Sequence, residues 1–165
     1  MYKNVSKHLK KNILLLIIGV LTINCKNNNG DNQSDSRLLY YAVKDSIINQ
    51  SEMLLNYTSE EYVYSKSNDS IILNLSLLKN TDKLYLGADL FELSEKNKYL
   101  NLDISNKSFD LYQIKYLDLE KTQILFNEDY GLLNIYYPEW KAQLLILKNK
   151  SEFRVNNDIL RIMED

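Results

Sequence analysis

Apolar residues recur at helical spacing over residues 37–57. Within residues 37–57 they fall on one side at Leu39, Val43 and Ile47, each four positions after the last. Ser36 precedes this stretch, and a serine hydroxyl suits the N-cap of a helix because it accepts a hydrogen bond from an amide of the first turn. The pattern therefore predicts an N-terminal amphipathic helix.

The pattern then changes to the period of a strand. Over residues 71–78, apolar side chains alternate with others, which predicts a strand with one well-buried face. A second helix is expected over residues 81–98, where Leu86, Leu90 and Leu93 lie on one side although Gly87 interrupts them. Five further strands are expected over residues 99–105, 109–117, 122–126, 132–137 and 141–147.

Turn residues separate these strands at short intervals, which favours antiparallel pairing. Asn106 and Lys107 mark one turn, and residues 127–131 mark another that ends in Gly131, a residue free to take positive φ. Pro138 lacks an amide donor and should end its strand. A short helix is expected over residues 157–163.

Together these elements predict one α+β domain over residues 36–165. An antiparallel β-meander of five to six strands would carry the N-terminal amphipathic helix and the short C-terminal helix on its apolar face. No internal repeat or interdomain linker is evident, and a single proline with four glycines leaves little room for either.

The start of the chain has the pattern of an export signal. Basic residues precede an apolar run over residues 13–23, which is well short of the ~20 residues that a helix needs to cross a bilayer. Residues 1–24 are therefore predicted to be a signal peptide. The polar segment 25–35 that follows has almost nothing apolar to bury, so we expect a flexible tether.

Cys25 directly follows the apolar run and resembles the lipidated cysteine of bacterial lipoproteins, although Thr22 and Asn24 replace the usual leucine and small residue of that motif. Relaxed motifs of this kind resemble those of Bacteroidetes lipoproteins, and residues 124–133 resemble a strand, Tyr-Gly turn and strand found in small lipoproteins of that group. The resemblance implies an outer-membrane protein, on the periplasmic face or the cell surface, held by acyl chains on Cys25, which bind a bilayer stably when there are two or more. The alternative is an ordinary cleaved signal with an incidental cysteine.

Composition excludes several kinds of chemistry. The only histidine is His8, inside the predicted signal, and the only cysteine is Cys25. A mature, acylated chain would lack Ser-His-Asp and Cys-His catalysis, histidine or thiolate metal sites and disulfides. Acidic pairs such as Glu60 and Glu61, Glu128 and Asp129, and Glu164 and Asp165 are interpreted as surface acids. We therefore expect no enzyme activity, no metal and no cofactor.

Charge narrows the choice of partners. Removal of the four signal lysines leaves 16 basic against 22 acidic residues, a net charge of about −6. A nucleic-acid-binding protein would need a basic patch, so no nucleic-acid partner is expected. The expected membrane contact is the lipid anchor, and the ligand or protein partner is left open.

The favoured function is a membrane-anchored binding or structural module. Tyr136 and Trp140 are candidates for an aromatic ligand platform, although strand alternation sends Tyr136 and Tyr137 to opposite faces. One alternative is a lipid or lipoprotein carrier with a cavity under the sheet. Another is an immunity-type lipoprotein with an acidic surface. Ser70, within Asp69-Ser70-Ile71, resembles an O-glycosylation site of Bacteroidetes secreted proteins.

Overall fold

The computed structural model describes residues 33–44, 46–66, 70–78, 81–114 and 122–164. The predicted signal and Cys25 lie outside this range, whereas the last residues of the predicted tether belong to the first strand. The strands are β1 (Gln33–Val43), β2 (Ser46–Tyr57), β3 (Glu61–Ser65), β4 (Ile71–Leu78), β5 (Lys83–Leu86), β6 (Asp89–Tyr99), β7 (Phe109–Ile114), β8 (Gln123–Asn127), β9 (Gly131–Tyr137) and β10 (Ala142–Leu147). Two 3₁₀ segments, η1 (Pro138–Trp140) and η2 (Lys150–Val155), and one helix, α2 (Asn156–Glu164), complete the described elements.

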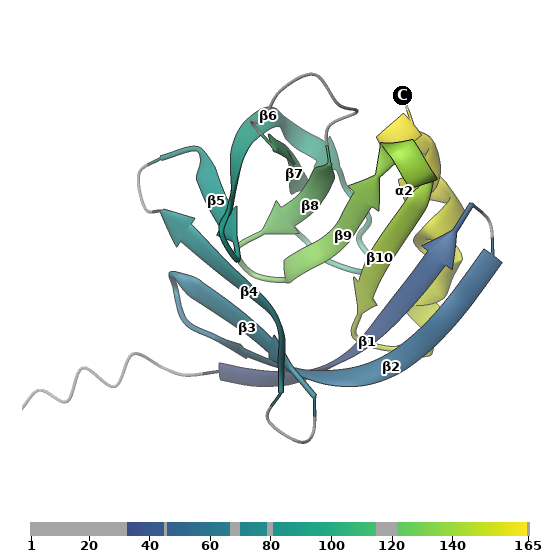
Figure 1. The fold of residues 1–165 in the computed structure, drawn as a ribbon, viewed down its shortest axis with the longest axis horizontal. Helices are drawn as coiled ribbons and strands as arrows, with labels where there is room; N and C mark the ends of the chain where they lie inside the picture. The colour runs from purple at the N-terminus through teal and green to yellow at the C-terminus, as the bar shows by residue number, and fades with distance from the viewer. Residues whose placement is uncertain (1–32, 45, 67–69, 79–80, 115–121, 165) are drawn as a thin grey trace, which may run out of the picture. The chain divides into compact units, whose positions relative to one another are not determined.

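The ten strands form a closed antiparallel barrel (Figure 1). Every strand pairs with its neighbours in sequence, and β1 pairs with β10, where Leu38 lies opposite Leu147 and Val43 lies opposite Ala142. Closure satisfies backbone groups that an open sheet would leave along its edges. The prediction of an α+β meander covered by an N-terminal helix is therefore wrong.

The largest error concerns residues 37–57, which form the β1–β2 hairpin and not a helix. Leu39 faces the barrel interior, while its neighbours Leu38 and Tyr40 pack on the outside against the C-terminal part of the chain. Because both faces of β1 are covered, apolar residues occupy consecutive positions and hide the period of two. Lys44, with φ of 53°, lies in the turn that interrupts the supposed helix.

The predicted helix over residues 81–98 is also wrong, since these residues form β5 and most of β6. Gly87, at φ of 62°, makes the tight turn between the two strands. The predicted strand 99–105 is wrong as well, because β6 ends at Tyr99 and the following residues form the loop to β7.

Other predictions are confirmed. The strand over residues 71–78 is β4, and β8, β9 and β10 match their predicted positions within one residue. Gly131 follows its turn with φ of 88°, and Pro138 ends β9 and starts η1. The C-terminal helix is present, with Ile159, Leu160 and Met163 buried.

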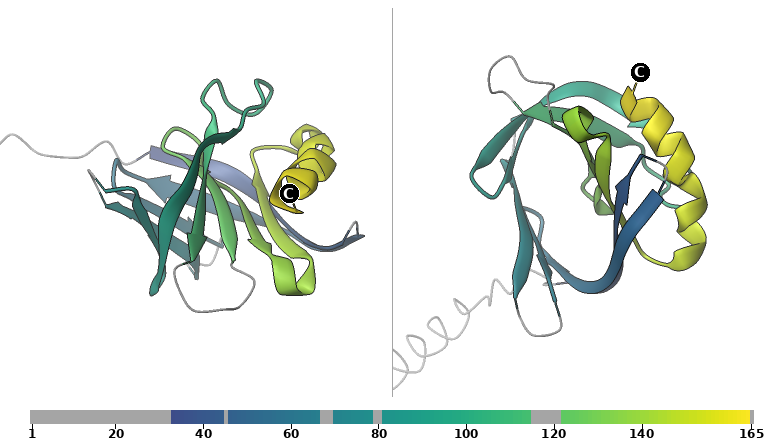
Figure 2. Two further views of the ribbon diagram at one scale, coloured as in Figure 1. Left: turned by 90° about the horizontal axis from the view of Figure 1, so that it is seen from above. Right: turned by 45° about the vertical axis from the view of Figure 1, so that its right-hand side comes forward.

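The barrel has two cores. An inner cluster fills its interior, and an outer cluster lies between α2 and the outer faces of β1 and β7 to β10. Figure 2 shows α2, in yellow, lying along the outside of the barrel. Within this outer layer, Asn134 donates to Gln143 and Gln143 donates to Asn156, both at 2.7 Å, so buried amides link β9, β10 and α2. Among the described residues, no helix is long and apolar enough to span a bilayer.

Candidate functional site

One end of the barrel, which we call the β8–β9 end, carries the turns β2–β3 and β8–β9. Here two tyrosines of β3 reach across the interior. The Leu132 amide donates to the Tyr64 hydroxyl at 2.8 Å, and the Tyr62 hydroxyl donates to the Glu128 carbonyl at 2.7 Å. Because β3 does not neighbour β8 or β9 in the sheet, these bonds cross the barrel. Gly131 makes the approach possible, since a Cβ there would lie 2.6 Å from the Tyr64 hydroxyl.

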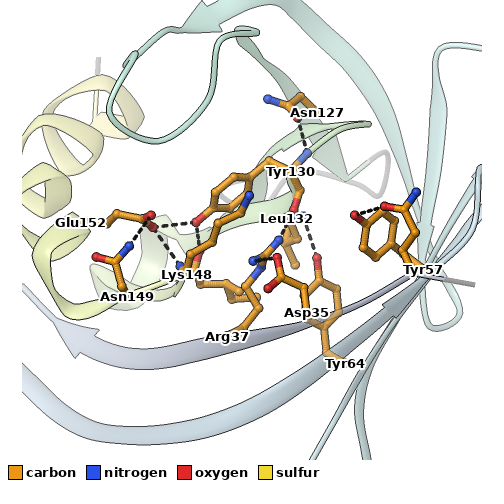
Figure 3. A network of polar contacts seen from close by, with 12 residues as sticks. Asp35, Arg37, Tyr57, Tyr64, Asn127, Tyr130, Leu132, Lys148, Asn149 and Glu152 are labelled. Carbon is orange, nitrogen blue, oxygen red and sulfur yellow. Dashed lines mark hydrogen bonds and ion pairs between the residues drawn. The ribbon is translucent and has the colours of Figure 1, made fainter.

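A second group of buried polar contacts lies beside this crossing (Figure 3). Arg37 is only 2% exposed, and its guanidinium donates to the Tyr130 carbonyl at 3.0 Å and pairs with Asp35 at 2.5 Å. It also lies 4.8 Å from the centre of the Tyr130 ring. The Tyr130 hydroxyl lies 3.0 Å from a carboxylate oxygen of Glu152, which also accepts from the Lys148 amide at 2.8 Å. The network thus joins β1, the β8–β9 hairpin and η2.

Burial keeps these tyrosines neutral. It raises the pKa of Tyr64 well above the usual value, although the Leu132 amide and Arg37 act in the opposite direction. Burial also raises the pKa of Tyr130, and the Glu152 carboxylate raises it further. Neutral phenols can therefore keep their hydrogen bonds across the whole physiological pH range.

The opposite end, which we call the β9–β10 end, carries the turns β1–β2, β5–β6 and β9–β10. Its inward-facing apolar side chains are only half-buried: Ile72, Leu73, Leu86, Ile114, Tyr137 and Leu144. All pack against the inner cluster, whose members come from strands around the whole barrel, so they face the interior. Within the described residues of the β8–β9 end, Tyr57 and Leu77 are the half-buried members, and Tyr57 stacks on Tyr62. Exposed inner apolar surface is therefore concentrated at the β9–β10 end.

Aromatic residues stand at the rim of the β9–β10 end. Trp140 is 63% exposed, and its ring stacks on Tyr137 at a centroid distance of 5.7 Å. Burial raises the pKa of Tyr137, and Asp89 and Tyr41 raise it further. The Lys44 amide donates to the Lys141 carbonyl at 2.7 Å and links the β1–β2 turn to the β9–β10 turn.

The structure separates the two residues of the predicted platform. Tyr136 is buried in the outer cluster, whereas Trp140 lies at the rim with Tyr137. The predicted alternation of Tyr136 and Tyr137 is confirmed. Ser70 is exposed directly before β4, and Cys25 lies outside the described residues.

The acidic pairs within the described residues are surface groups. Glu60, Glu61, Glu128 and Asp129 are exposed, and Asp129 pairs with Lys107 at 2.9 Å. No group of three or more potential metal ligands occurs in the described part of the chain.

Sequence reasoning missed the polar network at the β8–β9 end. Arg37 was the available signal, because it is a lone cation followed by six apolar residues, Leu38 to Val43. Such a residue, once the stretch is assigned to a strand, is a candidate for a buried and paired charge.

Comparison with known proteins finds no matching family model, no matching curated protein and no matching solved structure. The fold itself defines the class, a closed up-and-down barrel of ten strands with a helix packed on its outside.

Proposed function

We propose that this is a non-enzymatic binding protein of the bacterial outer membrane, tethered through Cys25, which takes one small apolar molecule into the β9–β10 end of its barrel. The observation that carries the ligand proposal is the asymmetry between the two ends. Hydrogen bonds cross the interior at the β8–β9 end, and half-buried apolar side chains face the interior at the other.

Barrel size supports a small ligand. A barrel of about eight strands has an interior just wide enough for side chains or one small ligand, and the diameter grows with strand number. Ten strands therefore leave more room than eight. Burial of apolar surface contributes about 25 cal/mol per Å², so a ligand that covers Leu86, Ile114 and Leu144 would be held mainly by the hydrophobic effect.

The geometry also favours a slender molecule over a protein surface. Leu144 and Leu73 belong to strands of the barrel wall and point inward, so a flat partner could not reach them. At the rim, Trp140 and Tyr137 offer aromatic faces to a molecule that passes between solvent and interior. This develops the carrier alternative, with the ligand inside a barrel and not beneath an open sheet.

The test uses N-phenyl-1-naphthylamine, an apolar dye that fluoresces when it leaves water. We expect saturable binding of one dye per chain. Leu144→Trp, which fills the interior, should weaken binding about tenfold, a loss of ~1.4 kcal/mol. Leu102→Trp is the matched control, because Leu102 is 77% exposed in the β6–β7 loop and should leave dye affinity unchanged.

Two outcomes would contradict the proposed ligand site. One is the absence of saturable binding to the wild-type chain, and the other is an equal effect of the two tryptophan variants. Circular dichroism would show whether Leu144→Trp folds, and Leu86→Trp provides a second filled interior if it does not.

The tether is tested by the intact mass of the protein from its native membranes. We expect a chain that begins at Cys25 and carries acyl groups, with hexose increments if Ser70 is glycosylated. Cys25→Ser should release the protein from the membrane fraction. An unacylated mature chain would contradict the tether and leave the proposal of an interior ligand site unaffected.

A further inference from the structure

A groove of about 630 Å³ lies beside the β1–β2 pair, away from the β9–β10 end. β1 pairs with β10 only from Leu38 onward, whereas residues 33–37 pair with β2 alone. The groove occupies the place that β10 leaves when the chain turns towards η2. It is lined by Ser36, Arg37, Leu38, Glu52, Met53, Leu54 and residues 148–150.

The charges on this groove are mainly positive. Arg37, Lys148 and Lys150 line it together with one acidic residue, Glu52. In the part of the chain that the structure describes, no carboxylate pairs with the ammonium group of Lys148 or Lys150, and that of Lys148 lies 5.1 Å from the centre of the Tyr130 ring. Asp35 pairs with Arg37, and Glu152 accepts from the Lys148 backbone amide, so with Glu52 three acids balance the three cations, and the attraction for an anion comes from the local positions of the Lys148 and Lys150 ammonium groups.

Arg37 has an unused donor. Its terminal nitrogens bond to Asp35 and the Tyr130 carbonyl, but its Nε has no hydrogen-bond partner among the described residues, although the side chain is 98% buried. A buried donor without a partner costs about 1–3 kcal/mol. Nε is itself buried, so an acceptor in the groove would remove this cost by reaching it between the side chains that cover Arg37.

Apolar side chains form the rest of the wall. Met53 is buried, Leu38 is half-buried and Leu54 is 39% exposed, so each can contact a hydrocarbon chain in the groove. A mixed lining of cations and aliphatic side chains matches a molecule with a charged head and a short apolar chain.

We propose that this groove binds an organic carboxylate with a short aliphatic chain. The carboxylate accepts from Arg37 Nε and from the ammonium groups of Lys148 and Lys150, and the chain packs against Leu38, Met53 and Leu54. This second site is separate from the interior ligand site and does not depend on it.

The test is a titration of the full chain with octanoate, monitored by nuclear magnetic resonance. Saturable shifts of the Arg37 Nε–H signal and of the Lys148 and Lys150 amides are expected. Acetate lacks the chain and octanol lacks the charge, so each should bind at least about tenfold more weakly. Equal affinity for octanol and octanoate, or an unmoved Arg37 signal, would overturn the proposal.

Single substitutions can distinguish octanoate binding in this groove from dye binding in the barrel interior. Lys150→Glu should weaken octanoate binding about tenfold and leave the naphthylamine dye unaffected. Lys66→Glu, the same charge change at an exposed residue of the β3–β4 loop, is the matched control and should change neither affinity. Leu144→Trp should spare octanoate, and loss of octanoate binding in that variant would assign the ligand to the interior and overturn the groove.

Discussion

Gly131→Ala is expected to lower the free energy of unfolding by about 3 kcal/mol. Gly131 has φ of 88°, and a left-handed conformation costs a residue with a Cβ about 1–2 kcal/mol. The new Cβ would also lie 2.6 Å from the Tyr64 hydroxyl and 3.3 Å from the Tyr62 ring, and overpacking of this kind costs about 1–3 kcal/mol. Denaturant unfolding monitored by circular dichroism measures the loss.

Gly87→Ala is the matched control. Gly87 also has positive φ, 62°, but a Cβ there would meet nothing within 4 Å, so only the backbone cost of about 1 kcal/mol should appear. Equal losses for the two glycine variants would show that contact with Tyr64 has no effect.

A double-mutant cycle isolates that contact. Tyr64→Phe alone should be destabilising, because it leaves the buried Leu132 amide without its acceptor. In the Gly131→Ala background the same change also removes the clashing hydroxyl. The double variant should therefore lose less stability than the sum of the two single losses. Strict additivity would contradict the close approach of the β8–β9 hairpin to β3.

Alkaline pH is expected to unfold the barrel through its buried tyrosines. The pKa values of Tyr64 and Tyr130 are raised from 10.0 by burial, and burial with nearby acidic groups raises that of Tyr112 to about 12. Above pH 10 the unfolded chain releases these protons while the folded chain keeps them. The folded state then binds more protons, so the free energy of unfolding falls as pH rises.

Tyr64 and Tyr130 are 0% and 2% exposed, and each should contribute a slope of about −1.4 kcal/mol per pH unit above pH 10. Urea titrations at intervals between pH 8 and 11.5 measure it. Tyrosine ionisation should leave the free energy of unfolding nearly constant below pH 9 and should make it fall steeply above pH 10. Tyr64→Phe should make this slope less steep by the contribution of one tyrosine. A free energy of unfolding that stays constant up to pH 11.5 would contradict buried neutral phenols.

Local chemistry made several features of this protein readable from the sequence. Asn127 to Gly131 form a turn because Gly131 alone tolerates positive φ there, and Pro138 ends β9 because it lacks an amide donor. The C-terminal helix has one buried face, and in the strand over residues 71–78 Leu73, Leu75 and Leu77 all pack in the inner cluster, so the periodicity of each shows its secondary structure.

Burial on both faces of a strand concealed the period of two in β1. In β1 and in β8 to β10, one face fills the barrel and the other packs under α2, and the apolar run within residues 37–57 then matched a helical repeat by coincidence. The candidate sites were hidden for a related reason. Tyr64 and Leu132 are 68 positions apart, and Arg37 and Tyr130 are 93 apart, so no local pattern relates them.

The sequence by itself determined the β8–β9 turn, the end of β9 at Pro138, the C-terminal helix and the opposite directions of Tyr136 and Tyr137, since each depends on the backbone preferences of a few adjacent residues. Only the tertiary structure decided the closure of β1 on β10, the hydrogen bonds across the β8–β9 end, the half-buried apolar interior at the other end and the groove beside Arg37. These depend on pairing between distant strands, whose free energy comes from long-range burial and is not encoded in any short segment.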